Sequence, residues 1–163
     1  MAKLDTLKDL LIDELKDLND AEHQITKALP KMAKAASNPQ LQTAFTSHLA
    51  ETEGQIRRLE QVFKALGLNP TRKTCEAMKG LLKEGDEVLE EKADPDVKDA
   101  ALIAAAQRVE HYEMAGYGTV RTFARTLGLN DVAQLLQETL NEEGAADKKL
   151  TQIAERQVNP QAQ

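Results

Sequence analysis

The sequence predicts an all-α protein built as a four-helix bundle, and three observations support this fold class. Alanine and leucine, which favour helices, number 23 and 22 of the 163 residues, whereas the β-branched residues valine and isoleucine number only 7 and 5. Apolar residues recur at spacings of three and four through four long segments, as on the buried face of a helix. Capping residues, prolines and glycines separate these segments.

The first half of the chain predicts a hairpin of two long helices. The first helix is expected over residues 4–34, and Pro30 is expected to kink or end it near its C-terminus. Asn38 followed by Pro39 is the pattern of an N-cap residue and a proline at the first helical position. This pattern predicts a second long helix over residues 39–66.

The second half predicts another hairpin. Asp94 followed by Pro95 repeats the capping pattern and predicts a third long helix over residues 95–126. A fourth long helix is expected over residues 131–156. Gly67, after the second helix, suits the position just beyond a helix end. The short connection within each pair makes each pair an antiparallel hairpin.

About 27 residues connect the two hairpins, and they hold a shorter helix expected over residues 74–90 and interrupted by Gly80 and Gly85. Four long helices with one long crossover have the connectivity of ferritin-like bundles. The prediction is a single domain over residues 1–157, followed by a frayed tail over residues 158–163.

Composition excludes several classes of protein. The net charge of −6 argues against a nucleic-acid-binding protein, which needs a basic face. Cys75 is the only cysteine, so neither an internal disulfide nor a cysteine-based zinc site can form. No apolar run approaches the roughly 18 residues that a membrane span needs. We therefore expect a cytoplasmic protein that does not enter a membrane.

Four acidic residues lie within the apolar stripes of the long helices, where a solvated side chain is not expected. They are Glu22, Glu113, Glu143 and Asp147. Burying an unpaired carboxylate costs several kcal/mol. A cation, a proton or a water-filled pocket must therefore offset that cost.

The carboxylates also match in height along the bundle. Glu22 lies 15 residues before Ser37 in the first hairpin loop, and Glu51 lies 14 residues after it. Glu113 and Glu143 lie 16 and 14 residues from the second loop. At 1.5 Å per residue, all four lie roughly 21–24 Å from the hairpin ends. Each long helix therefore places one carboxylate at about the same level.

Further candidate ligands lie one turn away. Glu110 and Asp147 each add a second carboxylate on the face that carries Glu113 or Glu143. His48 is the histidine best placed to supply a nitrogen ligand. Four to six converging carboxylates are what two hard divalent ions require. The predicted metal ligands are Glu22, Glu51, Glu110, Glu113, Glu143, Asp147 and His48.

Tyr117 lies one turn from Glu113 and can either hydrogen-bond a ligand or pack against the crossover. His23 and His111 face away from the stripes and are expected at a surface or an interface.

A resemblance to the YciE/YciF family of bacterial ferritin-like proteins extends over about residues 4–157. Four segments carry it: AEHQITKALPKMAKAASNPQL, HLAETEGQIRRLEQVF, KDAALIAAAQRVEHYEMAGYGT and LLQETLNEEGAADKKLTQIA. The resemblance implies a fold similar to rubrerythrin and the manganese catalases, an association with stress responses and a dimeric state. It also implies ferroxidase-type chemistry.

The rubrerythrin ligand pattern is matched on three helices. The matching residues are Glu22, Glu110, Glu113 and Glu143. Asp147 stands where that pattern has a histidine, and Gly54 stands three residues after Glu51, where it has another. His48 and Gln55 are the nearest substitutes, so the second-helix ligand is one of His48, Glu51 and Gln55. The oxygen-rich ligand set argues against rubrerythrin-like peroxidase chemistry.

Two functional hypotheses follow. The first is a dinuclear iron or manganese protein that oxidises Fe(II) or reacts with oxygen or peroxide. The second is a non-catalytic helical stress protein that acts as a dimeric or partner-docking module, with its carboxylates protonated, hydrated or paired with basic side chains. A homodimer is expected because the alanine-rich run DAALIAAAQ permits close helix packing.

Overall fold

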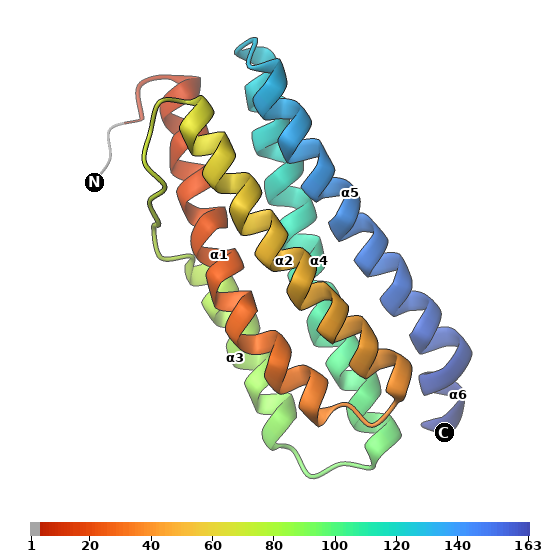
Figure 1. Cartoon of the computed structure of the whole chain (residues 1–163). Coiled ribbons are helices and arrows are strands. Elements are labelled where there is room, and N and C mark those ends of the chain that lie inside the picture. The colour runs from red at the N-terminus through yellow and green to blue at the C-terminus, as the bar shows by residue number, and fades with distance from the viewer. Residues whose placement is uncertain (1–3) are drawn as a thin grey trace.

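The computed structural model describes residues 4–163, and within that range the chain forms helices and no strands. The helices are α1 (Leu7–Ala35), α2 (Pro39–Ala65), α3 (Glu76–Glu90), α4 (Pro95–Thr126), α5 (Asn130–Ile153), the π-helical turn η1 (Ala154–Val158) and α6 (Asn159–Gln161). The four long helices α1, α2, α4 and α5 run alongside one another as a bundle (Figure 1). The all-α fold class is therefore confirmed.

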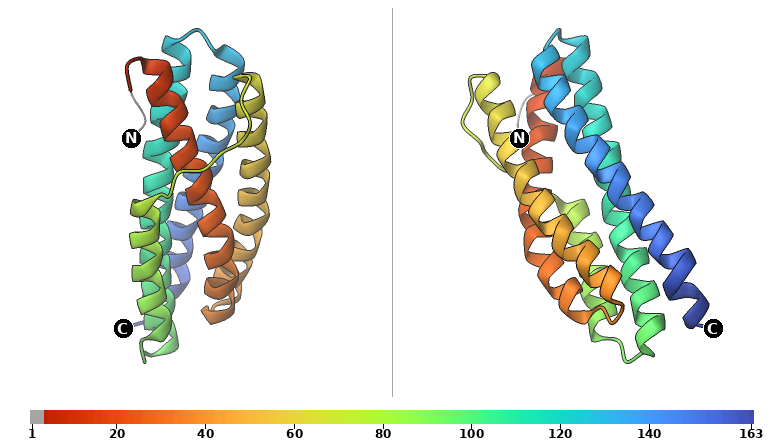
Figure 2. Two further views of the ribbon diagram at one scale, coloured as in Figure 1. Left: turned by 90° about the vertical axis from the view of Figure 1, so that its left-hand side faces the viewer. Right: turned by 45° about the vertical axis from the view of Figure 1, so that its right-hand side comes forward.

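The connectivity is that of two antiparallel hairpins joined by a long crossover. α1 packs against α2, and α4 packs against α5. The crossover returns along the length of the bundle, and its helix α3 packs against α4 and α1 on the outside (Figure 2). This is the ferritin-like arrangement that the sequence predicts.

Helix ends follow the capping signals closely. Asn38 Oδ1 accepts hydrogen bonds from the backbone of Gln40 (2.9 Å) and Leu41 (3.2 Å), and Asp94 Oδ1 accepts one from Asp96 (3.0 Å). After α2, Gly67 has a φ of +73°. The left-handed conformation lets Gly67 N–H and Leu68 N–H bond to carbonyls of the last turn, which closes the helix. Gly128 ends α4 in the same way.

α1 begins later and runs further than the sequence predicts. Thr6 and Asp9 form a reciprocal capping box, with Thr6 N–H donating to Asp9 (2.9 Å) and Asp9 N–H donating to Thr6 (3.1 Å). The helix therefore begins at Leu7 rather than residue 4. Pro30 does not end it, because the helix continues to Ala35.

The crossover helix α3 is continuous, so the expected interruptions at Gly80 and Gly85 are absent. Both glycines face open space, and the helix is held by its apolar face instead. Cys75, at its N-cap, and Met78 are fully buried in the core. Tertiary packing here outweighs the low helix propensity of glycine.

The C-terminal segment is also more ordered than the fraying expected for residues 158–163. The chain stays helical to Gln161, and Val158 is buried in the apolar core. Gln157 Oε1 accepts a hydrogen bond from Asn38 Nδ2 (3.2 Å), which ties the turn η1 to the α1–α2 loop. Burial of one apolar side chain and this polar contact hold the segment to the bundle.

The apolar core is divided into two clusters along the bundle axis. One cluster contains Leu18, Phe63, Tyr117 and Leu136, and the other contains Ile25, Phe45, Val109 and Leu150. Between them, all four long helices bury polar side chains. The fold therefore places a polar layer at mid-height, enclosed above and below by hydrophobic packing.

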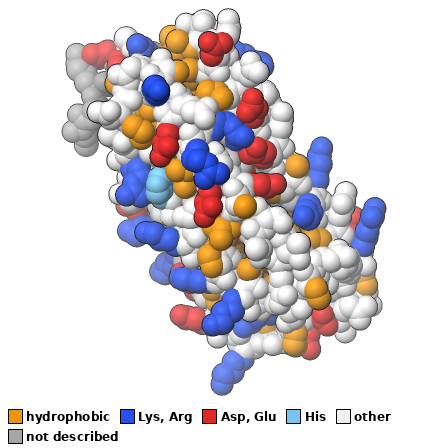
Figure 3. All heavy atoms as spheres, in the orientation of Figure 1, with side chains coloured by type: hydrophobic (Ala, Val, Ile, Leu, Met, Phe, Trp, Pro, Cys, Tyr) orange, Lys and Arg blue, Asp and Glu red, His pale blue; other side chains and the backbone are white. Residues whose placement is uncertain are grey.

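The outer surface carries interspersed charges. Acidic and basic side chains both occur over the face drawn in Figure 3, with several basic ones along its lower left edge. None of the helices in residues 4–163 combines the length and apolarity that a bilayer crossing requires.

Close packing of α4 on α1 gives a first testable prediction. A Cβ atom at Gly116 would lie 2.7 Å from Cδ2 of Leu18, which is buried in the core, whereas Gly118 on the same helix faces open space. We expect Gly116→Ala to lower the free energy of unfolding by about 1–2 kcal/mol through overpacking. The control Gly118→Ala should raise it by about 0.5–1 kcal/mol through helix propensity. Urea unfolding measures both, and equal effects of the two substitutions would contradict the packing argument.

Candidate metal centre

The polar layer is made of side chains from all four long helices. Its buried members are Glu22 from α1, His48, Thr52 and Gln55 from α2, Glu110 and Glu113 from α4, and Thr139 and Glu143 from α5. On each helix these residues continue the buried stripe that also carries the apolar core residues. The same periodicity that builds the core therefore brings the carboxylates together.

Four of these residues form a tight group. His48, Glu110, Glu113 and Glu143 each offer one ligand atom, and these atoms all lie within 4.8 Å of one another. His48 Nε2 lies 3.2 Å from Glu110 Oε1 and 3.6 Å from Glu143 Oε2. All four residues are buried. The group joins α2, α4 and α5.

Glu22 adds a fourth helix to the layer. Its carboxyl is fully buried and accepts a hydrogen bond from the hydroxyl of Tyr117. Tyr117 lies in the apolar cluster of the bundle, not against the crossover. Of the two roles open to Tyr117 from sequence, hydrogen bonding to a predicted ligand is the one that the structure shows.

On α2 the buried stripe passes through His48, Thr52, Gln55 and Leu59, and Glu51 lies beside it. The Glu51 side chain is 49% exposed and contacts His48 Nδ1 at 3.1 Å. Because successive helical residues are about 100° apart, the position before Thr52 turns away from the layer. Glu51 therefore lies outside the four-residue group, on the solvent side of His48.

Asp147, like Glu51, is a predicted ligand that lies apart from the buried carboxyl groups, and it faces the edge between α4 and α5. Its Oδ1 lies 3.1 Å from Gln107 Nε2 and 3.2 Å from Nε2 of His111, whose side chain is 65% exposed. These surface contacts draw the Asp147 carboxylate away from the buried oxygens. His111 is a surface histidine, as expected.

Glu142 is a residue of the site that the sequence analysis did not single out. Arg58 binds it through two nitrogens (2.8 and 2.9 Å), and Gln55 Nε2 donates to it (3.1 Å) and to Glu143. Gln55 therefore links the buried carboxylates to an outer ion pair. The sequence indicates this contact in one way: Glu142 directly precedes Glu143, so its carboxylate lies beside the buried stripe to which Glu143 belongs.

The buried carboxyl groups lack partners for many of their lone pairs. Both oxygens of Glu113 and one oxygen each of Glu22, Glu110 and Glu143 have no hydrogen-bond partner. Asp99, which is equally buried, accepts from the backbone of Ser37 (2.8 Å) and Asn38 (2.7 Å) and has no such atoms. Among the ion pairs of residues 4–163, none joins these glutamates to lysine or arginine. The layer is therefore rich in carboxyl groups, and the basic side chain that contacts them is His48.

Burial raises the pKa of Glu22, Glu110 and Glu113 well above the ordinary value for glutamate, and the neighbouring carboxylates raise it further. Burial lowers the pKa of His48, but its contact with Glu51 and the charge of Glu143 outweigh that effect and leave the pKa raised. In the absence of a cation, the layer therefore holds protons.

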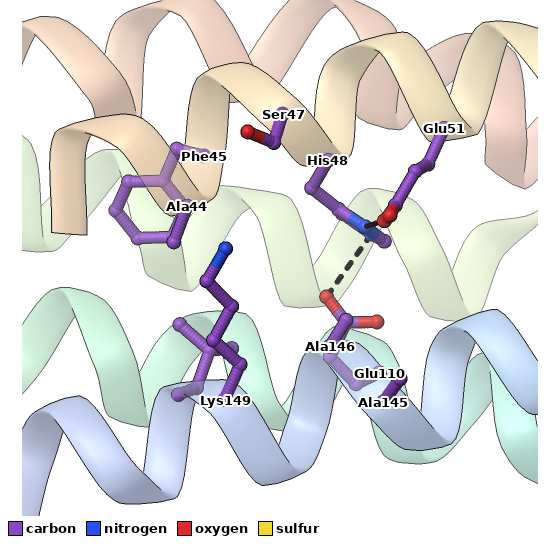
Figure 4. A pocket seen from close by; sticks show the side chains of 10 residues that line it. Ala44, Phe45, Ser47, His48, Glu51, Glu110, Ala145, Ala146 and Lys149 are labelled. Atoms are coloured by element: carbon purple, nitrogen blue, oxygen red, sulfur yellow. Dashed lines mark hydrogen bonds and ion pairs between the residues drawn. The ribbon is translucent and has the colours of Figure 1, made fainter. Parts of the chain in front are cut away.

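A pocket between α2 and α5 reaches the layer from the surface. It has a volume of about 100 Å³, which is room for several waters, and is lined by Ala44, Ala146, His48, Glu51 and Glu110 among others. Figure 4 shows His48 between Glu51 at the outside and Glu110 at the inside, within contact of both. The layer is therefore not sealed from solvent.

The donor set suits a hard divalent cation. Carboxylate oxygens with free lone pairs, together with one imidazole nitrogen, match the ligands that iron and manganese prefer. A cation would also add positive charge to a layer in which four glutamates face His48. The residues present therefore fit the metal that ferritin-like folds carry.

Comparison with known proteins agrees with the fold and identifies relatives. A family model described as a domain of unknown function, DUF892, matches residues 6–163. Protein YciF of Escherichia coli strain K12 is 50% identical over 159 residues, which cover 97% of this chain and 96% of YciF.

Solved structures are similar over nearly the whole chain. The crystal structure of the E. coli stress protein YciF matches with a TM-score of 0.92 and 51% identity, covering 95% of this chain and 98% of that one. YcfI of Rhodopseudomonas palustris, whose description proposes a structural role, matches with a TM-score of 0.90 and 52% identity over 91% and 95% of the two chains. A protein of Xanthomonas campestris pv. campestris, at 20% identity and a TM-score of 0.73 over 92% of each chain, shares the fold alone. The full-length matches show that this chain belongs to the YciF family, whose domain is DUF892.

Proposed function

We propose that this protein binds iron or manganese as a dinuclear centre in its polar layer and serves a stress response by oxidising Fe(II) or reacting with oxygen or peroxide. One observation carries the proposal. Five buried oxygen atoms of four glutamates have no hydrogen-bond partner, and no lysine or arginine of residues 4–163 pairs with these glutamates. The relationship to the E. coli stress protein YciF supports the physiological setting.

The residues that would hold the metal are Glu22, Glu110, Glu113, Glu143 and His48. His48, Glu110, Glu113 and Glu143 already bring their ligand atoms together, and Glu22 lies close enough for its charge to raise the pKa of Glu113. Bound iron or manganese would supply one-electron redox chemistry toward oxygen or peroxide. Glu51 and Asp147 lie outside this set.

The protein's own contribution is to hold these side chains in place. Tyr117 fixes one oxygen of Glu22, Gln55 fixes one oxygen of Glu143, and Glu51 contacts the outer nitrogen of His48. In each case the remaining lone pairs are left for the interior. Such supporting hydrogen bonds orient ligands and exclude competing rotamers.

Metal binding is the direct test. Chelator-treated protein should bind Mn(II) saturably, and its melting temperature should rise with the concentration of Mn(II), since a ligand at 100 times its Kd stabilises by about 2.7 kcal/mol. Glu113→Gln and Glu143→Gln should abolish the shift, whereas Glu53→Gln, an exposed position on α2, should keep it. Anaerobic Fe(II) followed by oxygen or peroxide then tests the reaction, which Glu113→Gln should also lose. Identical melting shifts in all four proteins would refute the site.

A purely structural role is the alternative, and the description of the R. palustris relative favours it. In that case the glutamates would remain protonated, and replacing one with a hydrophobic residue should be harmless. We expect Glu113→Leu to raise the stability of the metal-free protein by about 1–4 kcal/mol, because an unpaired buried acid is removed. The same substitution should abolish the response to Mn(II). Stabilisation together with unchanged stress protection in cells would favour the structural role.

The pH dependence of stability distinguishes the metal-free from the metal-bound layer. Glu22, Glu110 and Glu113 have raised pKa values when folded, so the stability that their protonation provides is complete below their unfolded pKa near 4.5. It is lost as the pH rises through the folded values, by up to about 1.4 kcal/mol per pH unit for each group. We expect the melting temperature of chelator-treated protein to fall as the pH rises above about 5, and less steeply in Glu113→Gln. His48, with its raised pKa, contributes in the same direction.

Added Mn(II) should reverse this trend, because the cation competes with protons for the same lone pairs and binds more tightly as they leave. Melting curves recorded across the pH range with chelator or Mn(II) provide the measurement. A melting temperature of the metal-free protein that rises with pH would contradict the pKa assignments.

A further inference from the structure

The pocket between α2 and α5 opens the polar layer to solvent on one side of the bundle. Its walls include the small side chains of Ala44, Ala145 and Ala146, and its inner end reaches His48 and Glu110. Lys149 lies on its rim and is exposed. The small side chains keep the pocket open, and its volume of about 100 Å³ admits a partly hydrated ion but not a larger ligand.

Side chains that can bind a cation form a series from this pocket into the layer, and their exposed fraction falls step by step. The side chains of Glu51, His48, Glu110 and Glu143 are 49%, 7%, 4% and 0% exposed. Adjacent members are in contact, with 3.1 Å from Glu51 to His48 and 3.2 Å from His48 to Glu110. A cation can therefore exchange water for protein ligands one at a time.

The neighbouring side of the layer is less suitable for a cation. There the guanidinium of Arg58 covers Gln55 through its bidentate pair with Glu142, and the Arg58 side chain is only 18% exposed. Arg58 is paired with both Glu142 and Glu138, so it closes this side of the layer by its bulk, whereas alanine side chains line the α2–α5 pocket.

We propose that the α2–α5 pocket is the route by which a divalent cation reaches the layer, and that Glu51 is the residue that first captures it. This inference rests on the proposed metal centre and assigns Glu51 a transient role instead of a place among the resident ligands. Lys149 opposes capture through its charge. Glu51 and Lys149 therefore set the rate of metal uptake but not the affinity of the centre.

Rate and affinity separate the two roles of Glu51. A residue on the route changes the rates of uptake and release by the same factor and leaves Kd unchanged, because it affects only the barrier between the two states. A resident ligand instead changes Kd. Removing one steering charge should change the rates by about tenfold at low salt, and the difference should shrink as salt is added.

The experiment uses full-length, chelator-treated protein and Mn(II) as the probe. Stopped-flow mixing with a fluorescent Mn(II) chelator measures uptake, excess EDTA measures release, and equilibrium titration measures Kd. Glu51→Gln removes the charge but keeps a hydrogen-bonding group beside His48 Nδ1, so it should slow both rates with little change in Kd, and Lys149→Gln should accelerate both. Ala146→Leu, which narrows the pocket without changing charge, should also slow both. Glu53→Gln, an exposed glutamate on the same helix, is the matched control and should change neither rate.

Three results would overturn the inference. Unchanged rates in Glu51→Gln would remove Glu51 from the route, even if Ala146→Leu slowed uptake. A Kd weakened in proportion to faster release would make Glu51 a resident ligand. Failure of the unsubstituted protein to bind Mn(II) would refute the metal centre itself, and with it the route.

Discussion

The central physical constraint on this molecule is the charge of its polar layer. Four glutamates from three helices meet in the interior, and none is paired with lysine or arginine within the described chain. Leaving such groups ionised and unpaired would cost several kcal/mol each. The folded protein must therefore hold either protons or cations there. The stability of the protein, the pH dependence of that stability and the proposed metal binding therefore all depend on how the charge of these carboxyl groups is neutralised.

The rest of the bundle is organised around that layer. Apolar clusters pack on both sides of the layer along the bundle axis and hold the helices at fixed heights. Tyr117 and Gln55 satisfy one oxygen each of Glu22 and Glu143 and leave the remaining lone pairs inward. Asp99 shows that this fold can bury a carboxylate with full hydrogen bonding where only structure is needed. The unsatisfied oxygens of the layer are therefore a specific feature of the site.

The comparisons show that the chain belongs to the YciF family. The geometry of the polar layer adds which chemical groups this chain brings together in its interior. The site differs from a closed structural core because a narrow pocket connects it with solvent through His48. The two sides of the layer differ, because the pocket beside Glu51 opens one of them and the Arg58–Glu142 pair covers the other. The proposed metal centre would therefore be reached from one side of the bundle.

The sequence by itself determined the helices, their caps and the heights of the acidic residues. Asn38, Asp94 and Gly67 act through hydrogen bonds and backbone angles within a few residues, so their effects can be predicted locally. Glu22, Glu110, Glu113 and Glu143 were identifiable because helical periodicity and rise per residue are fixed.

Only the tertiary structure decided which side chains enter the layer from α2 and which polar groups orient them. Glu51 and His48 differ by three positions and both lie near the stripe, and the rotation of α2 against α5 turns His48 inward. Asp147 turns to His111 and Gln107, and Val158 packs into the core instead of fraying, because partners on other helices are available. The orientations of these side chains depend on contacts between residues that are distant in the sequence. The local pattern of apolar and polar residues cannot predict those contacts.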